Sequence, residues 1–258
     1  MEKTYQTNQR VAVVTGGAMG IGSKISERLA KKDLMVLVSD INEDAANETV
    51  RRLRAEGYSA APLLMDVGRQ ESISSAFAQV DKEYGRCDVL VNCAGIATVF
   101  PFLDFPIEDF VNTMNVNVTG TLLCSQHAAR LMLRNRWGRI VNIASVAGMR
   151  AVGTGRTAYG TSKGAVISLT RQMAVELAEY GITANAVAPG PVDTPMTQKL
   201  HTAKFRDEYS RAIPMNRYGT MSEIASAVLY LASEEASYIT GIVMPVDGGF
   251  LSSGARGI

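Results

Sequence analysis

The sequence predicts an α/β fold in which helices cover both faces of a parallel sheet, and two patterns indicate it. Short apolar runs alternate with helix-like segments along most of the chain. Neighbouring parallel strands need such a helical crossover, which is right-handed. The runs are apolar throughout rather than alternating, as expected of strands buried on both faces. We therefore expect a doubly wound sheet in a three-layer α/β/α sandwich.

The first half of the chain supplies four expected strands and three expected helices. β-branched residues are frequent in the strand runs, while Gly57 and Gly85 stop the second and third helices. Pro62 lies within the third strand and indicates a strand start or an irregular edge, because proline cannot donate to a sheet ladder. The expected strands are 11–14, 35–40, 60–66 and 88–92, and the expected helices are 21–32, 43–56 and 72–84.

The second half repeats this alternation with longer helices. One helix is expected over 108–136, with Gly120 as the place where it can bend, and another over 158–180, ended by Gly181. Residues 190–215 contain three prolines and little periodicity, which favours a loop with short helices. The expected strands here are 139–143, 183–188 and 243–246, which brings the sheet to seven.

Bulk composition favours one domain, residues 1–258, because no linker or repeat interrupts the 258 residues. The 26 basic and 25 acidic residues give a net charge of +1, which provides no footprint for nucleic acid. The sequence contains no run of 18 apolar residues, so no membrane-spanning helix is expected. Residues 1–10 lack the apolar core of a signal peptide. Cys87, Cys93 and Cys124 have no metal-ligand spacing, so we expect reduced thiols, no metal and a cytoplasmic location.

A glycine-rich turn, residues 15–22, follows the first strand and opens the first helix. A pyrophosphate needs close backbone approach, free N–H groups and a helix N-terminus, and glycine permits all three. The T-G-x-x-x-G-x-G spacing differs from the G-x-G-x-x-G fingerprint, so an ordinary strand–helix turn is the alternative. Its position after the first strand favours a dinucleotide cradle formed by Gly16, Met19, Gly20, Ile21 and Gly22.

Asp40 ends the second strand, where a carboxylate can accept hydrogen bonds from the adenosine ribose. The same charge would repel the 2′-phosphate of NADP, and neither Ala18 nor Ile41 supplies an arginine, so NAD is favoured over NADP. A turn-forming Asp at a strand end is the structural alternative. The ends of the third and fourth strands can hold the adenine and line the cofactor channel through Asp66, Val67, Asn92, Ala94 and Gly95.

Tyr159 and Lys163 are four residues apart in an expected helix and therefore face the same space. A free phenol, with an ordinary pKa of about 10, is a poor base, but an adjacent ammonium favours the phenolate. Ser145 follows the fifth strand and can reach the same cleft, where it could bind a substrate oxygen. A surface Tyr–Lys pair and a turn-forming serine are the alternatives for each feature alone. Their occurrence with the glycine turn favours hydride transfer between nicotinamide and an alcohol or ketone.

At these residues the chain resembles the short-chain dehydrogenase/reductase family over about 10–250. The resemblance implies a Rossmann-like single domain with a seven-stranded parallel sheet, usually tetrameric. Ser145 and Tyr159 are fourteen residues apart, where thirteen is common, so the extra residue falls in the substrate loop at 148–157. The motifs that carry the resemblance are the glycine turn, Asn92-Cys93-Ala94-Gly95, Asn117, Ser145, Tyr159-x-x-x-Lys163 and Pro189-Gly190.

The resemblance also implies roles for these residues. Tyr159 would be the general acid/base, Lys163 would lower its pKa and bind the nicotinamide ribose, and Ser145 would position the substrate oxygen. Asn117 would support a proton-relay water, with its neighbour Asn115 as the alternative. The segment after the sixth strand would cover the nicotinamide through Pro189, Gly190, Val192 and Thr194, and residues 195–215 would form a mobile lid.

The resulting hypothesis is an NAD-dependent oxidoreductase that interconverts a secondary alcohol, such as a polyol or diol, and its ketone. In class it would be a short-chain alcohol dehydrogenase or carbonyl reductase acting on CH–OH donors with NAD(P). Reduction of a 3-oxoacyl thioester is the second enzymatic reading, and a non-enzymatic NAD-binding scaffold is the third. His127 is expected to pack within its helix, and His201, in the lid, could touch substrate. The substrate, its chirality and the physiological direction are not readable from the sequence.

Overall fold

A computed structural model describes residues 9–254, apart from the side chains of residues 196, 199 and 200. Its centre is a seven-stranded sheet in the order β3-β2-β1-β4-β5-β6-β9, in which every neighbouring pair is parallel. The predicted fold class and all seven predicted strands are therefore confirmed. The strands are β1 (Val11–Thr15), β2 (Met35–Asp40), β3 (Ala60–Leu64), β4 (Val89–Asn92), β5 (Gly138–Ile143), β6 (Ile182–Pro189) and β9 (Val243–Val246).

The strand order reverses between β1 and β4. From β1 the chain runs outward through β2 to β3, and then crosses back to place β4 on the other side of β1. The loops that leave β1 and β4 therefore diverge at the carboxyl edge of the sheet, where open α/β sheets bind ligands. Pro62 lies in β3, an outer strand of the sheet, where a missing N–H costs least.

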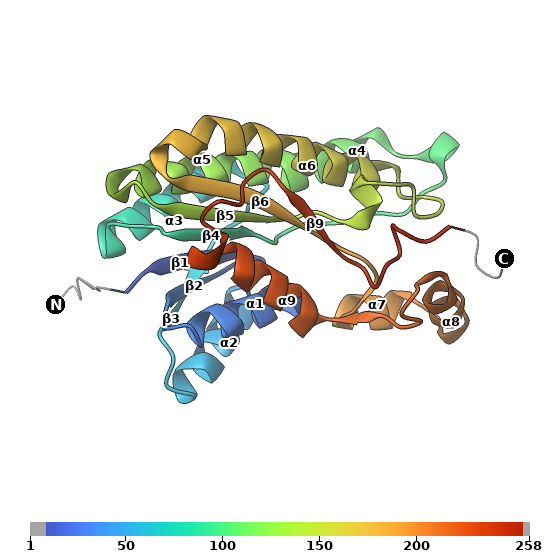
Figure 1. Ribbon diagram of the computed structural model, residues 1–258, viewed down its shortest axis with the longest axis horizontal. Coiled ribbons are helices and arrows are strands. Elements are labelled where there is room, and N and C mark those ends of the chain that lie inside the picture. Colours follow the sequence, from blue (N-terminus) through green and yellow to red (C-terminus); the bar gives the residue numbers. More distant parts are fainter. Residues whose placement is uncertain (1–8, 255–258) are drawn as a thin grey trace.

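Helices form a layer on each face of the sheet (Figure 1). In that view α3, α4, α5 and α6 lie above the sheet and α1, α2 and α9 below it, while α7 and α8 lie beyond its right-hand end. The helices are α1 (Gly20–Ala30), α2 (Glu43–Ala55), α3 (Gln70–Tyr84), α4 (Ile107–Met114), α5 (Gly120–Met132), α6 (Thr157–Leu177), α7 (Pro195–Leu200), α8 (Ala203–Ala212) and α9 (Met221–Leu231).

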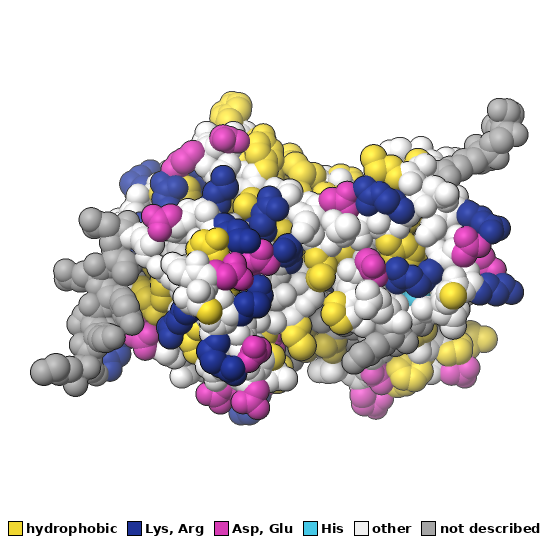
Figure 2. All heavy atoms as spheres, turned by 90° about the horizontal axis from the view of Figure 1, so that it is seen from below, with side chains coloured by type: hydrophobic (Ala, Val, Ile, Leu, Met, Phe, Trp, Pro, Cys, Tyr) yellow, Lys and Arg dark blue, Asp and Glu magenta, His cyan; other side chains and the backbone are white. Residues whose placement is uncertain are grey.

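Each face of the sheet buries its own apolar cluster. Val14 and Val38 belong to the cluster shared with α1, α2 and α9, whereas Val13 and Leu37 belong to the one shared with α3, α5 and α6. Successive strand residues point to opposite faces, which is why strands buried on both sides read as continuous apolar runs. On the outer face of α1, α2 and α9, Lys and Arg side chains are interspersed with Asp and Glu (Figure 2).

The helix expected over 108–136 is interrupted. A five-residue π-helical turn, Asn115–Thr119, separates α4 from α5, and a 3₁₀ turn, Leu133–Asn135, follows α5. At the start of α5 a Cβ on Gly120 would lie 2.5 Å from the Val67 carbonyl oxygen, so α5 presses against the loop after β3. Single π-helical turns often mark functional sites, and here two asparagines of the turn reach neighbouring loops.

A loop with short helices was predicted over 190–215, and the segment contains the short helices α7 and α8. It also contains the short strand β7 (Val192–Asp193), which pairs in parallel with β8 (Gly219–Thr220). Helix α9, which the sequence reading did not predict, begins with a capping box between Thr220 and Glu223. Within residues 9–254, no helix is long and apolar enough to cross a membrane.

The centre of the sheet should be sensitive to lost volume. Ile140 of β5 is fully buried between its partners Leu90 and Ala184. Ile140→Ala should lower the free energy of unfolding by about 2–5 kcal/mol and Ile140→Val by about 0.5–1.5 kcal/mol, because the cost grows with the cavity left behind. Urea unfolding measures both, and equal losses in the two variants would contradict this packing.

Candidate active site

The glycine turn after β1 is held against the loop after β4. Gly16 has a φ of +61°, and a Cβ there would lie 2.9 Å from the Cα of Ala94. Inside the turn, a Cβ on Gly22 would lie 2.0 Å from the Gly16 carbonyl oxygen. Both positions therefore require glycine, for packing of the protein itself.

Gly20 is different because the space around it is open. Its φ is +55°, yet a Cβ there would meet none of the described atoms within 4 Å. Among the described residues no side chain caps the N-terminus of α1, which begins at this glycine, and Met19 beside it is exposed. Free N–H groups at a helix N-terminus and open space beside a glycine fit a bound pyrophosphate.

Asp40, at the end of β2, is held in a fixed orientation. One carboxylate oxygen accepts from the Ala18 N–H at 3.2 Å and the other from the Asn42 N–H at 3.1 Å, so the side chain joins the glycine turn to the start of α2. It is only 7% exposed. Its neighbour Ile41 is exposed and uncharged, so it supplies no cation for a phosphate at this position.

Thr15 joins the loops at the switch point, a role the sequence reading missed. Its hydroxyl accepts from the backbone N–H groups of Cys93 and Ala94, both at 3.1 Å. The hydroxyl-bearing residue just before the first glycine was the available signal. Burial raises the pKa of the Cys93 thiol to about 11, partly offset by the nearby Lys163 ammonium, so this cysteine is a neutral thiol at neutral pH.

Two residues predicted to bind cofactor use their side chains within the protein. The Asn92 amide nitrogen donates to the Ser125 hydroxyl at 3.0 Å and to the Asn142 amide oxygen at 2.8 Å, so it is fully occupied within the protein. Asp66 accepts from the Gly68 N–H at 2.8 Å and shapes the loop after β3. Val67, also predicted for the adenine, is half-buried and packs through its carbonyl against α5.

Lys163 and Tyr159 lie together on α6, as the four-residue spacing predicts. The Lys163 Nζ is 5.7 Å from the centroid of the Tyr159 ring. The lysine is 5% exposed and donates to the Ile143 carbonyl oxygen at 2.7 Å, at the end of β5. The helix therefore holds a buried ammonium beside a half-buried phenol at the carboxyl edge of the sheet.

Asn117, rather than Asn115, is linked to the helix turn that carries Tyr159. Its amide oxygen accepts from the Ile96 N–H, and its nitrogen donates to the Ile96 carbonyl and to the Ser162 hydroxyl, all at 2.9 Å. Ser162 in turn donates to the Tyr159 carbonyl at 2.8 Å. Asn115 instead donates to the Gly68 carbonyl at 2.8 Å.

Gly95 lies between the asparagine and the lysine. A Cβ there would be 3.1 Å from the Asn117 amide oxygen and 3.5 Å from the Lys163 Nζ. Ser162, which the sequence reading did not single out, therefore completes a continuous set of contacts from the loop after β4 to α6.

Ser145 follows β5 and caps the 3₁₀ turn Val146–Gly148, where its hydroxyl accepts from the Ala147 N–H at 3.1 Å. This turn packs directly on α6, since a Cβ on Gly148 would lie 2.5 Å from the carbonyl carbon of Lys163. The loop that carries the serine is thus fixed against the helix that carries Tyr159 and Lys163.

The segment after β6 leads from the sheet into α7. The Gly190 N–H donates to the Val246 carbonyl at 3.0 Å, Val192 is buried, and the Thr194 hydroxyl caps α7 by accepting from the Thr197 N–H at 3.1 Å. Pro189 is the last residue of β6. These residues line the carboxyl edge, although the Thr194 hydroxyl already serves the helix cap.

The two histidines lie apart. His127 stacks on Phe77 with ring centroids 5.5 Å apart, which agrees with a packing role. His201, at the end of α7, shares a hydrogen bond of 3.0 Å with the Tyr218 hydroxyl.

A parallel sheet with a glycine turn at its switch point and a tyrosine–lysine pair at the same edge is the architecture of nicotinamide-dependent α/β oxidoreductases. Residues 16–251 match the family model described as enoyl-(acyl carrier protein) reductase. The chain belongs to the short-chain dehydrogenase/reductase family, whose members are oxidoreductases that bind a nicotinamide cofactor.

Relatives and solved structures in this family match almost the whole chain. The 3-oxoacyl-(acyl-carrier-protein) reductase FabG of Aquifex aeolicus is 39% identical over 241 residues, 93% of this chain and 96% of the relative. The NAD-dependent glycerol dehydrogenase of Listeria innocua is 34% identical over 249 residues, 96% of each chain. A short-chain type dehydrogenase/reductase from Mycobacterium marinum superposes with a TM-score of 0.90 at 34% identity, covering 95% of this chain and 96% of that structure.

The open space at Gly20 can be tested with a matched pair. Gly20→Ala and Gly57→Ala both place a Cβ at positive φ where no described atom lies within 4 Å, so each should cost about 1–2 kcal/mol of stability. Only Gly20→Ala should weaken NAD(H) binding, by roughly tenfold or more, because the methyl group occupies the proposed pyrophosphate site. Titration of NADH fluorescence measures the affinity, and equal affinities in the two variants would contradict the cradle.

Proposed function

We propose that the protein is an NAD-dependent oxidoreductase that interconverts a secondary alcohol, of the polyol or diol type, and its ketone. The observation that carries this proposal is the placement of the buried Lys163 ammonium beside Tyr159, with Asn117 bonded through Ser162 to the same helix turn. The NAD-dependent glycerol dehydrogenase among the relatives is consistent with it.

In this proposal the Tyr159 phenol exchanges the proton of the substrate hydroxyl. The Lys163 ammonium stabilises the phenolate electrostatically, since it lies on the face of the ring and is almost excluded from solvent. Ser145 hydrogen-bonds the substrate oxygen and stabilises the charge that develops there. Bound NAD supplies the acceptor for the hydride.

The proposed role of Asn117 is to hold two parts of the site in place. It ties the loop after β4 to α6, so the backbone at Ile96 and the helix turn at Tyr159 keep a fixed separation. The π-helical turn provides this geometry by directing Asn117 toward α6. We also assign it the support of a proton-relay water.

We propose NAD rather than NADP because of Asp40. Its carboxylate lies at the end of β2, oriented by two backbone N–H groups. Ribose hydroxyls can donate to it, whereas a 2′-phosphate would meet like charge beside the uncharged Ile41. The cradle residues and the loops after β3, β4 and β6 would bind the rest of the dinucleotide.

The second candidate is a 3-oxoacyl-(acyl-carrier-protein) or 3-oxoacyl-thioester reductase, favoured by the 39% identity to FabG of Aquifex aeolicus. A substrate screen that follows NADH absorbance separates the two. It would compare sugar alcohols, diols and cyclic alcohols with NAD against 3-oxoacyl thioesters with NADPH. Higher kcat/KM for the thioesters with NADPH would replace the first proposal with the second.

The remaining expectations complete the proposal. Residues 1–258 would form one NAD-binding domain with a lid over about 190–215, in a cytoplasmic homotetramer. The exposed apolar side chains of Ile107 and Val111 on α4 and Val175 on α6 would lie between subunits. Light scattering that shows a monomer would count against the tetramer.

The role of Tyr159 gives a direct test. Tyr159→Phe removes the hydroxyl and keeps the ring over which Lys163 lies, so NADH affinity and the unfolding midpoint should stay unchanged. The kcat/KM should fall by about 10²–10⁴-fold, the usual contribution of a general acid/base. Steady-state kinetics on the best substrate of the screen measure this, and substantial retained activity would refute the assignment.

The role of Asp40 predicts a change of cofactor preference. Asp40→Ala removes the charge that would repel a 2′-phosphate, so the ratio of kcat/KM for NAD to that for NADP should fall by roughly 10- to 100-fold. Asp40→Asn keeps the shape and the acceptor oxygen and should show part of this effect. An unchanged ratio in both variants would refute the ribose role.

A further inference from the structure

Arginines lie both in the lid and in the loop between Ser145 and Tyr159. Arg150 and Arg156 belong to that loop, and Arg206 belongs to α8. Two of the three guanidinium groups lie on aromatic rings, Arg150 at 5.0 Å from the centre of Phe250 and Arg206 at 4.4 Å from that of Tyr218.

An aromatic cluster joins these cations. The rings of Tyr218 and Tyr209 are 6.1 Å apart, and those of Tyr209 and Phe250 are 5.5 Å apart, both edge to face. Val146, next to Ser145 in the chain, is buried in the same apolar cluster as Tyr218 and Phe250. These contacts therefore pack the lid, the segment after β9 and the loop between Ser145 and Tyr159 into one unit.

The guanidinium groups of Arg206 and Arg156 are not fully paired with other groups in the described part of the protein. Arg206 donates through Nη2 to Asp193 at 3.0 Å, but its Nη1 is buried and finds no hydrogen-bond partner within the described residues. For Arg156, no ion pair or side-chain hydrogen bond is formed with any described residue. A guanidinium group that is partly withdrawn from water without a partner is unfavourable, so a ligand anion here would be stabilising.

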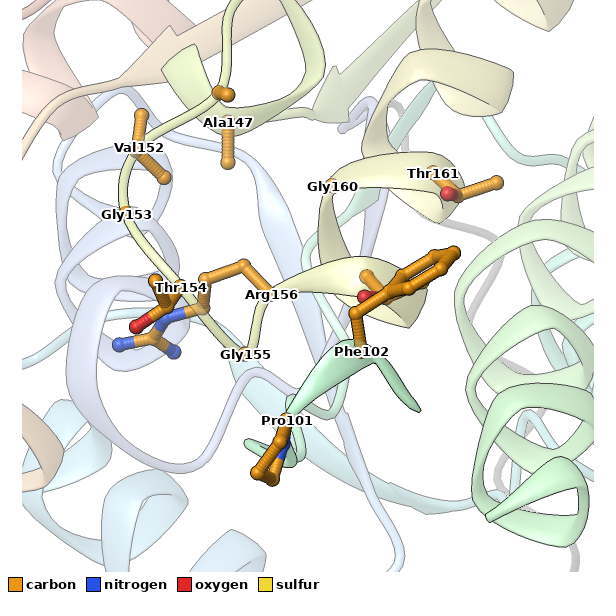
Figure 3. A pocket seen from close by; sticks show the side chains of 12 residues that line it. Pro101, Phe102, Ala147, Val152, Gly153, Thr154, Gly155, Arg156, Gly160 and Thr161 are labelled. Carbon is orange, nitrogen blue, oxygen red and sulfur yellow. The ribbon is translucent and has the colours of Figure 1, made fainter. Parts of the chain in front are cut away.

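Arg156 also forms part of the wall of a cavity of about 540 Å³ (Figure 3). Ala147, two residues after Ser145, and Gly160, the residue after Tyr159, line the same cavity, together with Val152 and Thr154. In Figure 3 the Arg156 side chain extends away from Gly160, toward the part of the view in which Thr154 lies.

Arg156 lies within electrostatic range of two side chains of the lid, His201 and Tyr209. Burial lowers the pKa of His201, and Arg156 and Arg206 lower it further. Burial raises the pKa of Tyr209, Arg156 and Arg150 oppose that rise, and Tyr159 adds to it. Tyr209 thus lies within electrostatic range of both loop arginines and of Tyr159.

We propose that the substrate carries a compact anionic group, a carboxylate, phosphonate or sulfonate, and that Arg156 binds it. This inference rests on the proposed oxidoreductase function and narrows its substrate class to hydroxy and oxo acids. The same anion chemistry could come from the phosphate of a thioester carrier, but a group directly on the substrate fits better. Arg156 lines the same cavity as Ala147 and Gly160, which lie within two residues of Ser145 and Tyr159, and this favours an anion on the substrate itself.

The test uses pairs of ketones in which a carboxylate is compared with its uncharged methyl ester. Acetoacetate and 4-oxopentanoate are each compared with their methyl esters, with NADH and with NADPH. Wild type should prefer the acid of at least one pair. Arg156→Ala should lower kcat/KM for that acid by roughly 10- to 100-fold, mainly through KM, and change the ester by less than about twofold. Arg156→Lys should recover part of the loss.

Lys204→Ala is the matched control, because it removes an exposed cation of the same lid and should leave both substrates unaffected. Equal losses for acid and ester in Arg156→Ala, or a wild-type preference for the esters, would overturn the proposal. Acetoacetyl-CoA and the neutral acetoacetyl-N-acetylcysteamine distinguish the other source of the anion. An Arg156→Ala loss confined to the CoA thioester, with the acids unaffected, would assign the arginine to a carrier phosphate and reject the proposal.

Binding of malonate separates this inference from the proposed function. At constant ionic strength and with NADH present, malonate should raise the melting temperature of wild type and of Lys204→Ala but not that of Arg156→Ala. Stabilisation without turnover of any ketone would support the anion site and count against the oxidoreductase proposal. Turnover of neutral ketones, with no stabilisation by malonate and no preference for the acids, would support the oxidoreductase proposal and overturn the anion site.

Discussion

The buried ammonium of Lys163 is the constraint on which the site depends. A cation that is 95% removed from solvent is costly unless dipoles or anions surround it, and here the carbonyl at the end of β5 is its hydrogen-bond acceptor. That bond fixes α6 along the sheet and therefore sets the height of Tyr159 above the carboxyl edge. The glycines at 95 and 148 allow two loops to approach the same lysine closely.

The interruption between α4 and α5 has a related effect. A regular helix places residues i and i+2 on different faces, and the π-helical turn directs Asn115 to the loop after β3 and Asn117 to the loop after β4. One turn of helix therefore braces two of the loops that border the cleft. Gly120 completes this arrangement, because only a residue without a side chain lets α5 approach the Val67 carbonyl so closely.

Local patterns were sufficient to predict the strands and to place Tyr159 and Lys163 together on one helix. Buried parallel strands carry a strong apolar signal, and the spacing from Tyr159 to Lys163 alone places both on one helix face. A bend near Gly120 was expected in the long helix, and the interruption ends there, but its π-helical form was not predicted because it depends on contacts with loops distant in sequence. Helix α9 was missed although Thr220 and Glu223 carry a capping signal. The hydrogen bond from Asn92 to Asn142 forms because β4 and β5 are neighbours in the sheet, and no local sequence pattern predicts that.

The segment after β9 has a consequence for how the lid can move. The ring of Phe250 packs with Tyr209 of the lid, and the Gly248 carbonyl accepts from the Met215 N–H. Strand β9 is an edge strand of the sheet, so these contacts tie the lid to that edge. Any displacement of α8 must therefore either break them or carry the segment after β9 with it.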